Sequence, residues 1–391
     1  MSRCGGRGHV VRIAHFSDAA VDGVNGIAAS IRLLTSEMAA RGHPSLVVST
    51  GRGDIKVPAL PTGMGDFRFS LFPLLPMRRK VLDWRPDVAH VHTPGPLGAA
   101  GLTVARELGI PAVYTYHTDM HGYSAFYYYP TLVIRAGTAI YARHLPRGPK
   151  VKGLGMYAAV EAANARVFEA ARVIILPTAT AMRHCRTAAH YAHKTRVIAT
   201  PPPHCSTVSD RPDQTVLFVG RVSAEKGIPL LLEAFARLRR EVPEAHLVLA
   251  GPVARRLGLP RRLARAGLTE HTAVTGVLHG EDVLTVYRHA SVFAFPSTTD
   301  TQGIVLHEAA LAGLPIVMVD RELAAAHPLG EVARLAEPTP ESLAAALRAA
   351  LESDPGETVA RARRIARAET PSQFAQRTLD AYRDALASDQ E

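Results

Sequence analysis

Two runs of alternating strand and helix patterns, separated by a proline-rich segment, constrain the fold of this chain more than any other feature. The first run opens with an apolar strand at 10–17, followed by apolar residues at helical spacing from Ile27 to Met38 and by the helix stop Gly42. Further strands are expected at 46–49, 88–92, 112–117 and 173–177, with helical stretches between most of them. Such alternation is typical of a parallel α/β sheet.

The second run repeats this architecture after a break. The segment ATPPPHCSTVSDRPD at 199–213 contains four prolines and small polar residues, as a linker would. A helix then follows at 228–238, with strands at 215–220, 247–251, 292–296 and 315–319, and a last amphipathic helix is expected at 373–386. Two doubly wound units bind ligands where the carboxyl ends of their strands face each other, so the interdomain cleft is the predicted site.

These patterns divide the chain into four parts. We predict an N-terminal Rossmann-like domain at 1–198, a linker at 199–214, a C-terminal Rossmann-like domain at 215–370, and a C-terminal helix at 371–391. A return of this helix to the N-terminal domain is one option.

Charge and composition narrow the range of partners. Forty-five Lys and Arg against thirty-five Asp and Glu give a net charge of +10, which favours phosphates, acidic lipid or nucleic acid, although arginines on solvated helix faces would give the same count. The sequence contains no window of ~20 apolar residues, so no membrane-spanning helix is predicted. The basic start MSRCGGRGH leads directly into a strand, so a cytoplasmic protein is expected. Three cysteines without a CxxC spacing predict reduced thiols.

A pair of acids joins a strand end to a helix in the second half. In STTDTQGIVLHEAALAGLPIV, Asp300 precedes the expected helix and Glu308 lies on it. Carboxylates suit sugar hydroxyls, and the amides near Gly303 and Ile304 at the helix start suit a diphosphate. The alternative is that Asp300 is a simple N-cap and Glu308 a surface acid.

Two further segments have residue types that bind phosphate. In GRVSAEKG, Arg221 and Lys226 can converge on a diphosphate and neutralise the charge of a leaving group, although both could be solvated loop cations. In DGVNGIA, which starts at Asp22, Gly23 and Gly26 permit a close approach of the backbone to a ligand, although this segment could be only a turn.

Together these residues resemble the retaining glycosyltransferases of family 4, which have the GT-B fold. The early glycine loop, GRVSAEKG, the run GVLHGEDVLTVYRHASVFAFPS and the acid pair occur in the family's order over about residues 10–320. Asp300 stands where Glu is commoner. The chain departs from the family in VIATPPPHCS, which replaces a VIPNGVD-like turn, and in the stretch after Val319, which lacks a glycine-rich pattern.

The resemblance implies that the domain at 1–198 binds the acceptor and the domain at 215–370 binds the nucleotide sugar. It also implies roles for single residues. Glu308 would bind the donor ribose, Asp300 with the Gly303–Ile304 backbone would hold the transferred sugar, Arg221 and Lys226 would grip the diphosphate, and Gly26 would approach it from the other domain. The segment TYHTD is similar to a family motif that puts His117 at a strand end facing the sugar and its acceptor; the alternative is a packing histidine. His117, Asp300, Arg221 and Lys226 are the implied catalytic residues. A hexose from a UDP- or GDP-linked donor and retention of configuration are implied by the resemblance only.

Other enzyme classes lack their signatures in this sequence. There is no GxxxxGK loop, GxSxG elbow or early GxGxxG, and HEAAL at His307 lacks the second histidine of a zinc protease. There is also no DxD motif, so we expect no metal and no cofactor apart from the donor, with the basic pair in the metal's electrostatic role. A noncatalytic nucleotide-sugar-binding protein is a remaining alternative, and no nucleic acid partner is predicted.

The acceptor is predicted from a region of the first half that has no acids. Between Met120 and Val160 there is no Asp or Glu, while basic residues such as Arg143 lie among aromatic ones such as Tyr127 and Tyr128. Such side chains suit an anionic membrane surface, and the stretch 67–80 is similar. We therefore predict a lipid or membrane-associated acceptor and a peripheral location at the inner membrane face. A small soluble metabolite or antibiotic as acceptor is the alternative, with the tyrosines lining its pocket.

Overall fold

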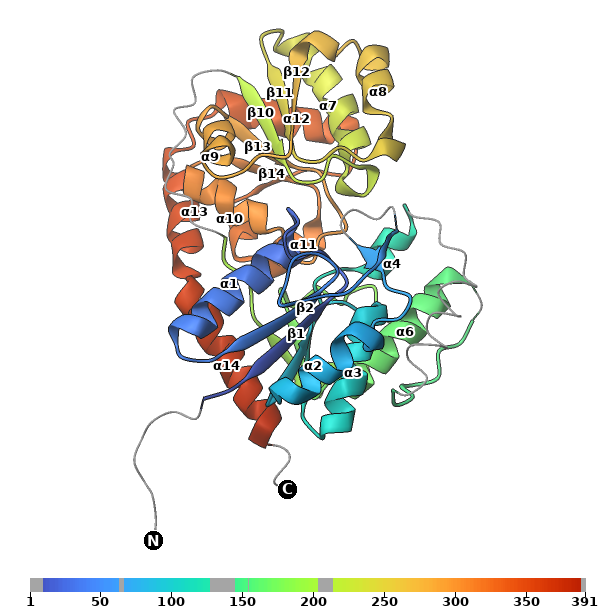
Figure 1. Cartoon of the computed structure of the whole chain (residues 1–391). Coiled ribbons are helices and arrows are strands. Elements are labelled where there is room, and N and C mark those ends of the chain that lie inside the picture. The colour runs from blue at the N-terminus through green and yellow to red at the C-terminus, as the bar shows by residue number, and fades with distance from the viewer. Residues whose placement is uncertain (1–9, 63–66, 127–144, 154, 203–213, 388–391) are drawn as a thin grey trace.

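The computed structural model describes residues 10–62, 67–126, 145–153, 155–202 and 214–387. Two parallel β-sheets, each covered by helices, lie one above the other (Figure 1). The predicted α/β fold with two Rossmann-like units is therefore confirmed. Tyr127, Tyr128 and Arg143, the three predicted acceptor residues, lie outside the described residues.

The first sheet has seven strands in the order β3-β2-β1-β6-β7-β8-β9, and every pairing is parallel. Its strands are β1 (Ile13–Ser17), β2 (Ser45–Ser49), β3 (Ile55–Lys56), β6 (Val88–Val91), β7 (Ala112–Thr115), β8 (Val173–Leu176) and β9 (Thr195–Val197). A short antiparallel pair, β4 (Leu60–Pro61) with β5 (Arg68–Phe69), lies beside it. The helices of this half are α1 (Gly26–Ala40), α2 (Leu74–Trp84), α3 (Pro96–Leu108), α4 (Met120–Ser124), α6 (Met156–Ala170) and the 3-10 helix η1 (Ala188–Lys194).

The second sheet has six parallel strands in the order β12-β11-β10-β13-β14-β15. Its strands are β10 (Thr215–Val219), β11 (His246–Ala250), β12 (Thr272–Gly276), β13 (Val292–Phe295), β14 (Ile316–Met318) and β15 (Arg334–Leu335). Its α-helices are α7 (Ile228–Glu241), α8 (Leu259–Ala266), α9 (Glu281–Arg288), α10 (Ile304–Ala312), α11 (Arg321–Ala326), α12 (Pro340–Glu352) and α13 (Gly356–Ala368), and its 3-10 turns are η2 (Ala224–Lys226), η3 (Arg255–Leu257), η4 (Thr269–His271) and η5 (Pro328–Glu331).

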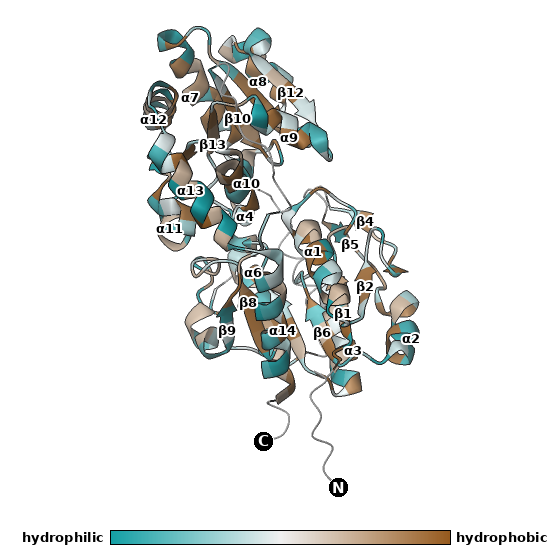
Figure 2. Cartoon of the chain, turned by 90° about the vertical axis from the view of Figure 1, so that its left-hand side faces the viewer, coloured by the Kyte–Doolittle hydropathy of each residue, from teal (hydrophilic) through white to brown (hydrophobic). Residues whose placement is uncertain are grey.

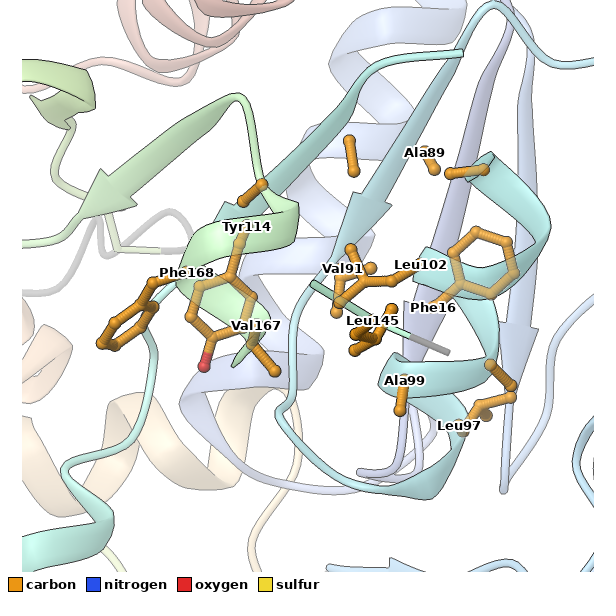
Figure 3. Close-up of a cluster of buried hydrophobic side chains, with 14 of the residues drawn as sticks. Phe16, Ala89, Val91, Leu97, Ala99, Leu102, Tyr114, Leu145, Val167 and Phe168 are labelled. Atoms are coloured by element: carbon orange, nitrogen blue, oxygen red, sulfur yellow. The ribbon is translucent and has the colours of Figure 1, made fainter. Parts of the chain in front are cut away.

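Both faces of the first sheet are covered by apolar packing. On one face, Phe16, Val91 and Tyr114 from the strands pack against Leu102 of α3 and Phe168 of α6 (Figure 3). The strands of both sheets are mostly brown in the hydropathy view, and many outer helix surfaces are teal (Figure 2). Near-continuous apolar strands are what a parallel sheet covered on both faces requires.

The last helix, α14 (Pro371–Ala387), covers the other face of the first sheet. In Figure 1 it runs from the second sheet's side of the molecule down along the first sheet. Its buried Phe374, Leu379 and Tyr382 pack with Ile13 and Val113 of the strands. The Tyr382 hydroxyl also hydrogen-bonds His90 Nδ1 at 2.7 Å. The core of the N-terminal half is therefore completed by the C-terminal end of the described chain.

Candidate functional site

A cavity of about 670 Å³ lies between the carboxyl ends of the two sheets. This is a typical volume for a small-molecule site. All eight predicted donor-binding and catalytic residues that the structure describes line it: Gly26, His117, Arg221, Lys226, Asp300, Gly303, Ile304 and Glu308. The structure thus brings together residues from both halves of the sequence, as expected for a cleft between doubly wound sheets.

The start of α10 leaves backbone amides available to a ligand. Gly303 is the N-cap residue with φ of 75°, and no side chain caps the helix. A Cβ atom at Gly303 would lie 2.8 Å from the Phe295 ring, so a larger residue would be both strained and crowded. The alternative that Asp300 is the N-cap of this helix is therefore wrong. Free N–H groups at a helix start favour an anion such as phosphate.

Helix α1 begins at the opposite wall of the cavity. Asn25 caps it by accepting a hydrogen bond from Ala28 N–H at 2.8 Å. A Cβ atom at Gly26 would lie 3.6 Å from Ile304 Cδ1, so the glycine loop approaches the start of α10 closely. The amino ends of two helices, one from each half, therefore meet at this cavity.

The two predicted phosphate-binding cations are paired with acids. Lys226 Nζ lies 2.5 Å from Asp300 Oδ1, and Arg221 Nη1 lies 3.2 Å from Glu225 Oε1. Burial disfavours the charged forms of Lys226 and Asp300, but their mutual attraction outweighs it, so the pKa of Lys226 is raised and that of Asp300 is lowered. Both groups are therefore charged near neutral pH, and a diphosphate would compete with Asp300 for the ammonium.

Glu308 is hydrogen-bonded by Tyr287, a residue that was not predicted to belong to the site. The Tyr287 hydroxyl donates to Glu308 Oε2 at 2.7 Å. Burial raises the pKa of Glu308, and this hydrogen bond partly offsets the effect. Helical spacing places Tyr287 with Val283 on the inner side of α9, but no local pattern links it to a glutamate on α10.

Hydrogen bonds tie the loop that carries Asp300 to the N-terminal half. Thr178 Oγ1 donates to Thr301 O at 2.6 Å, and Thr301 Oγ1 donates to His117 O at 2.8 Å. The buried amide of Gln302 accepts from Thr200 N–H at 3.0 Å and donates to Thr200 O at 2.7 Å. This loop is therefore positioned by both halves of the chain.

Arg183 makes a second set of contacts between the N-terminal half and the region of this loop. Arg183 contacts Asp320 at 2.6 Å and Glu322 at 3.2 Å, and it donates to Thr298 O at 2.9 Å. The Arg183 side chain is about one-tenth exposed, so this contact is better shielded from solvent than an ordinary surface ion pair.

His117 is half-buried at the cavity wall and is bonded to a second histidine. Its Nε2 lies 3.1 Å from Nδ1 of His92, which in turn hydrogen-bonds His15. Burial lowers the pKa of His117 to about 3, so its imidazole is neutral at physiological pH. His117 thus both lines the cavity and forms part of a buried network.

Two groups of potential metal ligands occur among the described residues, His15 with His90 and His92, and His121 with Glu161 and Cys185. In the first group, both nitrogens of His90 and His92 contact protein partners. In the second group, His121 Nε2 lies 2.8 Å from Glu161 Oε2, while the Cys185 thiol hydrogen-bonds His121 Nδ1. Metal binding in either place would have to replace these contacts, and the expectation that no metal takes part stays a prediction.

Comparison with known families gives two matches that together span most of the chain. Residues 24–202 match the family described as Glycosyltransferase Family 4, and residues 213–353 match the family described as Glycosyl transferases group 1. The division between the two matches falls at the proline-rich segment.

Named proteins show the same similarity. The alpha-monoglucosyldiacylglycerol synthase of Streptococcus pneumoniae is 26% identical over 78% of this chain and 70% of its own length. A GDP-mannose-dependent alpha-mannosyltransferase of Mycobacterium tuberculosis is 29% identical over 82% of this chain and 83% of its own. Among solved structures, the Anabaena protein HepE in complex with UDP and glucose superposes with a TM-score of 0.68 at 18% identity, covering 95% of this chain and 98% of that one.

Proposed function

Because this chain belongs to glycosyltransferase family 4 and has the two-domain GT-B fold, we propose that it transfers a hexose from a UDP- or GDP-linked donor to a lipid or membrane-associated acceptor, with retention of anomeric configuration. One observation carries the proposal. The acids, cations and helix amides that such a donor needs line a single cavity between the two sheets.

The donor side of the cavity has groups for each part of a nucleotide sugar. The carboxylate of Glu308 accepts hydrogen bonds from ribose hydroxyls, and Asp300 does the same for the sugar. The amides at the start of α10 and the cations Arg221 and Lys226 bind the diphosphate. Related proteins support this choice of donor, since one is named as GDP-mannose-dependent and a similar structure holds UDP.

The reaction breaks the bond between the anomeric carbon and the diphosphate oxygen and forms a bond to the acceptor oxygen. The proton of the acceptor hydroxyl leaves with the released nucleoside diphosphate. Negative charge on the diphosphate increases as the bond breaks, so Arg221 and Lys226 stabilise the transition state more than the ground state. In this proposal their two positive charges perform the electrostatic work without a metal ion.

The acceptor side of the cavity is apolar. Phe67, Met120 and Tyr123 pack together, and all three line the cavity. From Phe67 the chain continues to a surface on which Leu71, Phe72 and Leu75 are 49%, 70% and 82% exposed. Exposed apolar side chains next to basic ones are typical of contact with an anionic membrane surface.

Basic residues follow this apolar stretch on α2. Arg78, Arg79 and Lys80 are exposed, and Arg78 and Arg79 pair with Glu107 and Asp83 at the surface. Arg147 and Lys150 are also exposed in the first half of the chain. One relative is named as an alpha-monoglucosyldiacylglycerol synthase, and a glycolipid as the named product supports a lipid acceptor. Among the residues described, no helix combines the length and the apolar character that a bilayer crossing requires. We propose a peripheral membrane contact on the strength of the exposed apolar and basic side chains.

The test has two arms, the donor and the acceptor. We expect hydrolysis or transfer with one of a panel of UDP-, GDP- and ADP-sugars, and a larger rate when diacylglycerol in vesicles is added. Binding to anionic vesicles should exceed binding to neutral ones and weaken between ~0.05 and 0.5 M salt, because charge attraction is screened over roughly 10 Å at 0.1 M.

Variants separate the surface from the cavity. Phe72→Ser with Leu75→Ser should reduce vesicle sedimentation and transfer to lipid, while donor hydrolysis stays unchanged. Leu335→Ser, at an exposed position on the second sheet, is the control. Turnover on a soluble sugar or antibiotic acceptor without vesicle binding would favour the soluble-metabolite alternative. Donor binding without any turnover would favour a noncatalytic binding protein.

A further inference from the structure

We propose that His92 and His15 are positioning residues that hold His117 with its Nδ1–H directed at the cavity as a hydrogen-bond donor. The proposal rests on the proposed function only in assuming that the cavity binds the donor. It concerns a row of buried imidazoles that begins at the cavity wall and ends inside the first sheet.

The three rings form one hydrogen-bonded chain. His117 Nε2 lies 3.1 Å from His92 Nδ1, and His92 Nε2 lies 3.1 Å from His15 Nδ1. Successive ring centroids are 5.3 Å apart with interplanar angles of 21° and 28°. His15 and His92 are buried, with 0% and 2% of their surface exposed. Burial lowers the pKa of all three, which keeps the rings neutral.

A neutral imidazole has one N–H, so it donates with one nitrogen and accepts with the other. The two hydrogen bonds must therefore point in the same direction along the chain. If they point inward, His15 carries a proton on Nε2 and His117 offers a lone pair on Nδ1. If they point outward, His15 Nε2 is an unprotonated lone pair and His117 offers an Nδ1–H.

The buried end of the chain favours the outward direction. His15 Nε2 is inaccessible to solvent and has no hydrogen-bond partner among the described residues. An unpartnered buried N–H is rarer than an unpartnered acceptor. The other end of the chain favours the same choice, because a diphosphate or a sugar oxygen in the cavity accepts hydrogen bonds. His117 would therefore bind the donor through an N–H and would not act as a general base at Nδ1.

The backbone around His117 also restricts the ring. Thr301 Oγ1 donates to the His117 carbonyl oxygen at 2.8 Å, which ties this residue to the loop that carries Asp300. His117 Nδ1, the ring nitrogen that does not bond His92, is therefore held at a fixed place in the cavity wall.

His90 provides a matched control on β6, two residues before His92, which follows the end of that strand. Its ring centroid lies 4.0 Å from that of His92, but its nitrogens bond the Tyr382 hydroxyl and Thr115 Oγ1. It is buried like the members of the chain, yet it is not bonded to them. A substitution there tests for general damage to the core without breaking the chain.

The experiment is a two-bond ¹H–¹⁵N correlation spectrum of the full chain labelled at histidine, without any ligand, at pH 7. His117→Gln identifies the His117 signals by their loss. We expect the Nδ1–H tautomer at His117 in the wild type and in His90→Gln. His92→Phe should replace it by a mixture or by the Nε2–H tautomer, and His15→Phe, which preserves an aromatic ring in the buried stack, should do the same.

An Nε2–H tautomer or a cationic ring at His117 in the wild type would overturn the proposal. So would an unchanged His117 signal in both Phe variants, provided that their melting curves show a folded protein. Once a donor is known, His92→Phe should weaken its binding about tenfold, the loss of one hydrogen bond, while His90→Gln changes it less than about twofold. If no nucleotide sugar binds at all, the proposed function fails. The spectrum of the free protein still shows which nitrogen of His117 carries the proton, so it tests the positioning proposal separately.

Discussion

Replacing Glu308 by Gln should change stability and donor affinity in opposite directions. In the free protein, the Glu308 carboxylate is partly buried, has a raised pKa and accepts a hydrogen bond from Tyr287. A glutamine oxygen can still accept that hydrogen bond, but the charge that burial disfavours is gone. We therefore expect Glu308→Gln to raise the melting temperature of the free protein at pH 7 to 8.

The sign of the pH dependence follows from the raised pKa. The folded state binds a proton at Glu308 more tightly than the unfolded state, so the wild type loses stability as the pH rises above the ordinary value of 4.5 through the folded pKa. The stability gain of Glu308→Gln should accordingly be largest above that window and vanish below about pH 4.5. Differential scanning calorimetry of both proteins between pH 4 and 8 measures it.

The affinity of Glu308→Gln for the donor should decrease. A hydrogen bond from a ligand hydroxyl to a charged acceptor is worth ~1.5 to 3 kcal/mol, so the dissociation constant should rise about tenfold to 150-fold. Isothermal titration with the preferred nucleotide sugar checks this value. Glu281 is a suitable control, because it also lines the cavity but is exposed. Glu281→Gln should change the free energy of unfolding and the free energy of donor binding by less than about 0.5 kcal/mol each. Unchanged donor affinity in Glu308→Gln would refute the assignment of Glu308 to the donor.

Three further predictions concern the same cavity. Lys226→Met should lower turnover at saturating donor by ~10²-fold to 10³-fold, and it should also lower thermal stability because it leaves the buried Asp300 carboxylate without its ion pair. Adding Asp300→Asn should restore thermal stability but not turnover. Recovery of turnover in the double variant would show that Lys226 only neutralises Asp300. EDTA should leave the wild-type rate unchanged, whereas a strict requirement for a divalent ion would contradict the metal-free proposal. Gln302→Leu leaves the backbone N–H and C=O of Thr200 unpaired, so we expect the unfolding free energy to fall by ~1 to 3 kcal/mol in denaturation and the transfer rate to fall in the assay. Wild-type stability would mean that water replaces the amide.

The inner strands of both sheets could be predicted from the sequence because each is a short apolar run bounded by turn residues. The edge strands β3, β9, β12 and β15 and the pair β4–β5 are shorter or more polar, and they were not predicted. The expected strand at 112–117, for example, corresponds to β7, and His117 lies just past its end. The strand ends differ by one to three residues, since sheet pairing rather than residue type decides where a strand stops. The gathering of His117, Lys226 and Glu308 at one cavity follows from the same reasoning, because parallel strands present their carboxyl ends at one edge.

The contacts inside the cavity could not be predicted in the same way. Lys226 and Asp300 are 74 positions apart, and Thr301 lies 184 positions from the His117 carbonyl oxygen that it binds. Local patterns contain no information on such pairs. The N-cap alternative for Asp300 was reasonable from spacing alone, but the left-handed conformation of Gly303 gives that position to the glycine. The roles of these residues in binding and transfer remain predictions.

The return of α14 to the first sheet has a consequence for synthesis on the ribosome. The residues that build the second sheet, 215–335, and their covering helices up to Ala368 are contiguous in the chain. The first sheet, in contrast, has a face around Ile13 and Val113 that α1 covers only in part, and the rest stays uncovered until residues 371–387 have been made. Domains generally fold in the order of their synthesis. Here the half that is translated first is the half that is completed last, so its uncovered apolar face is open to chaperones during translation.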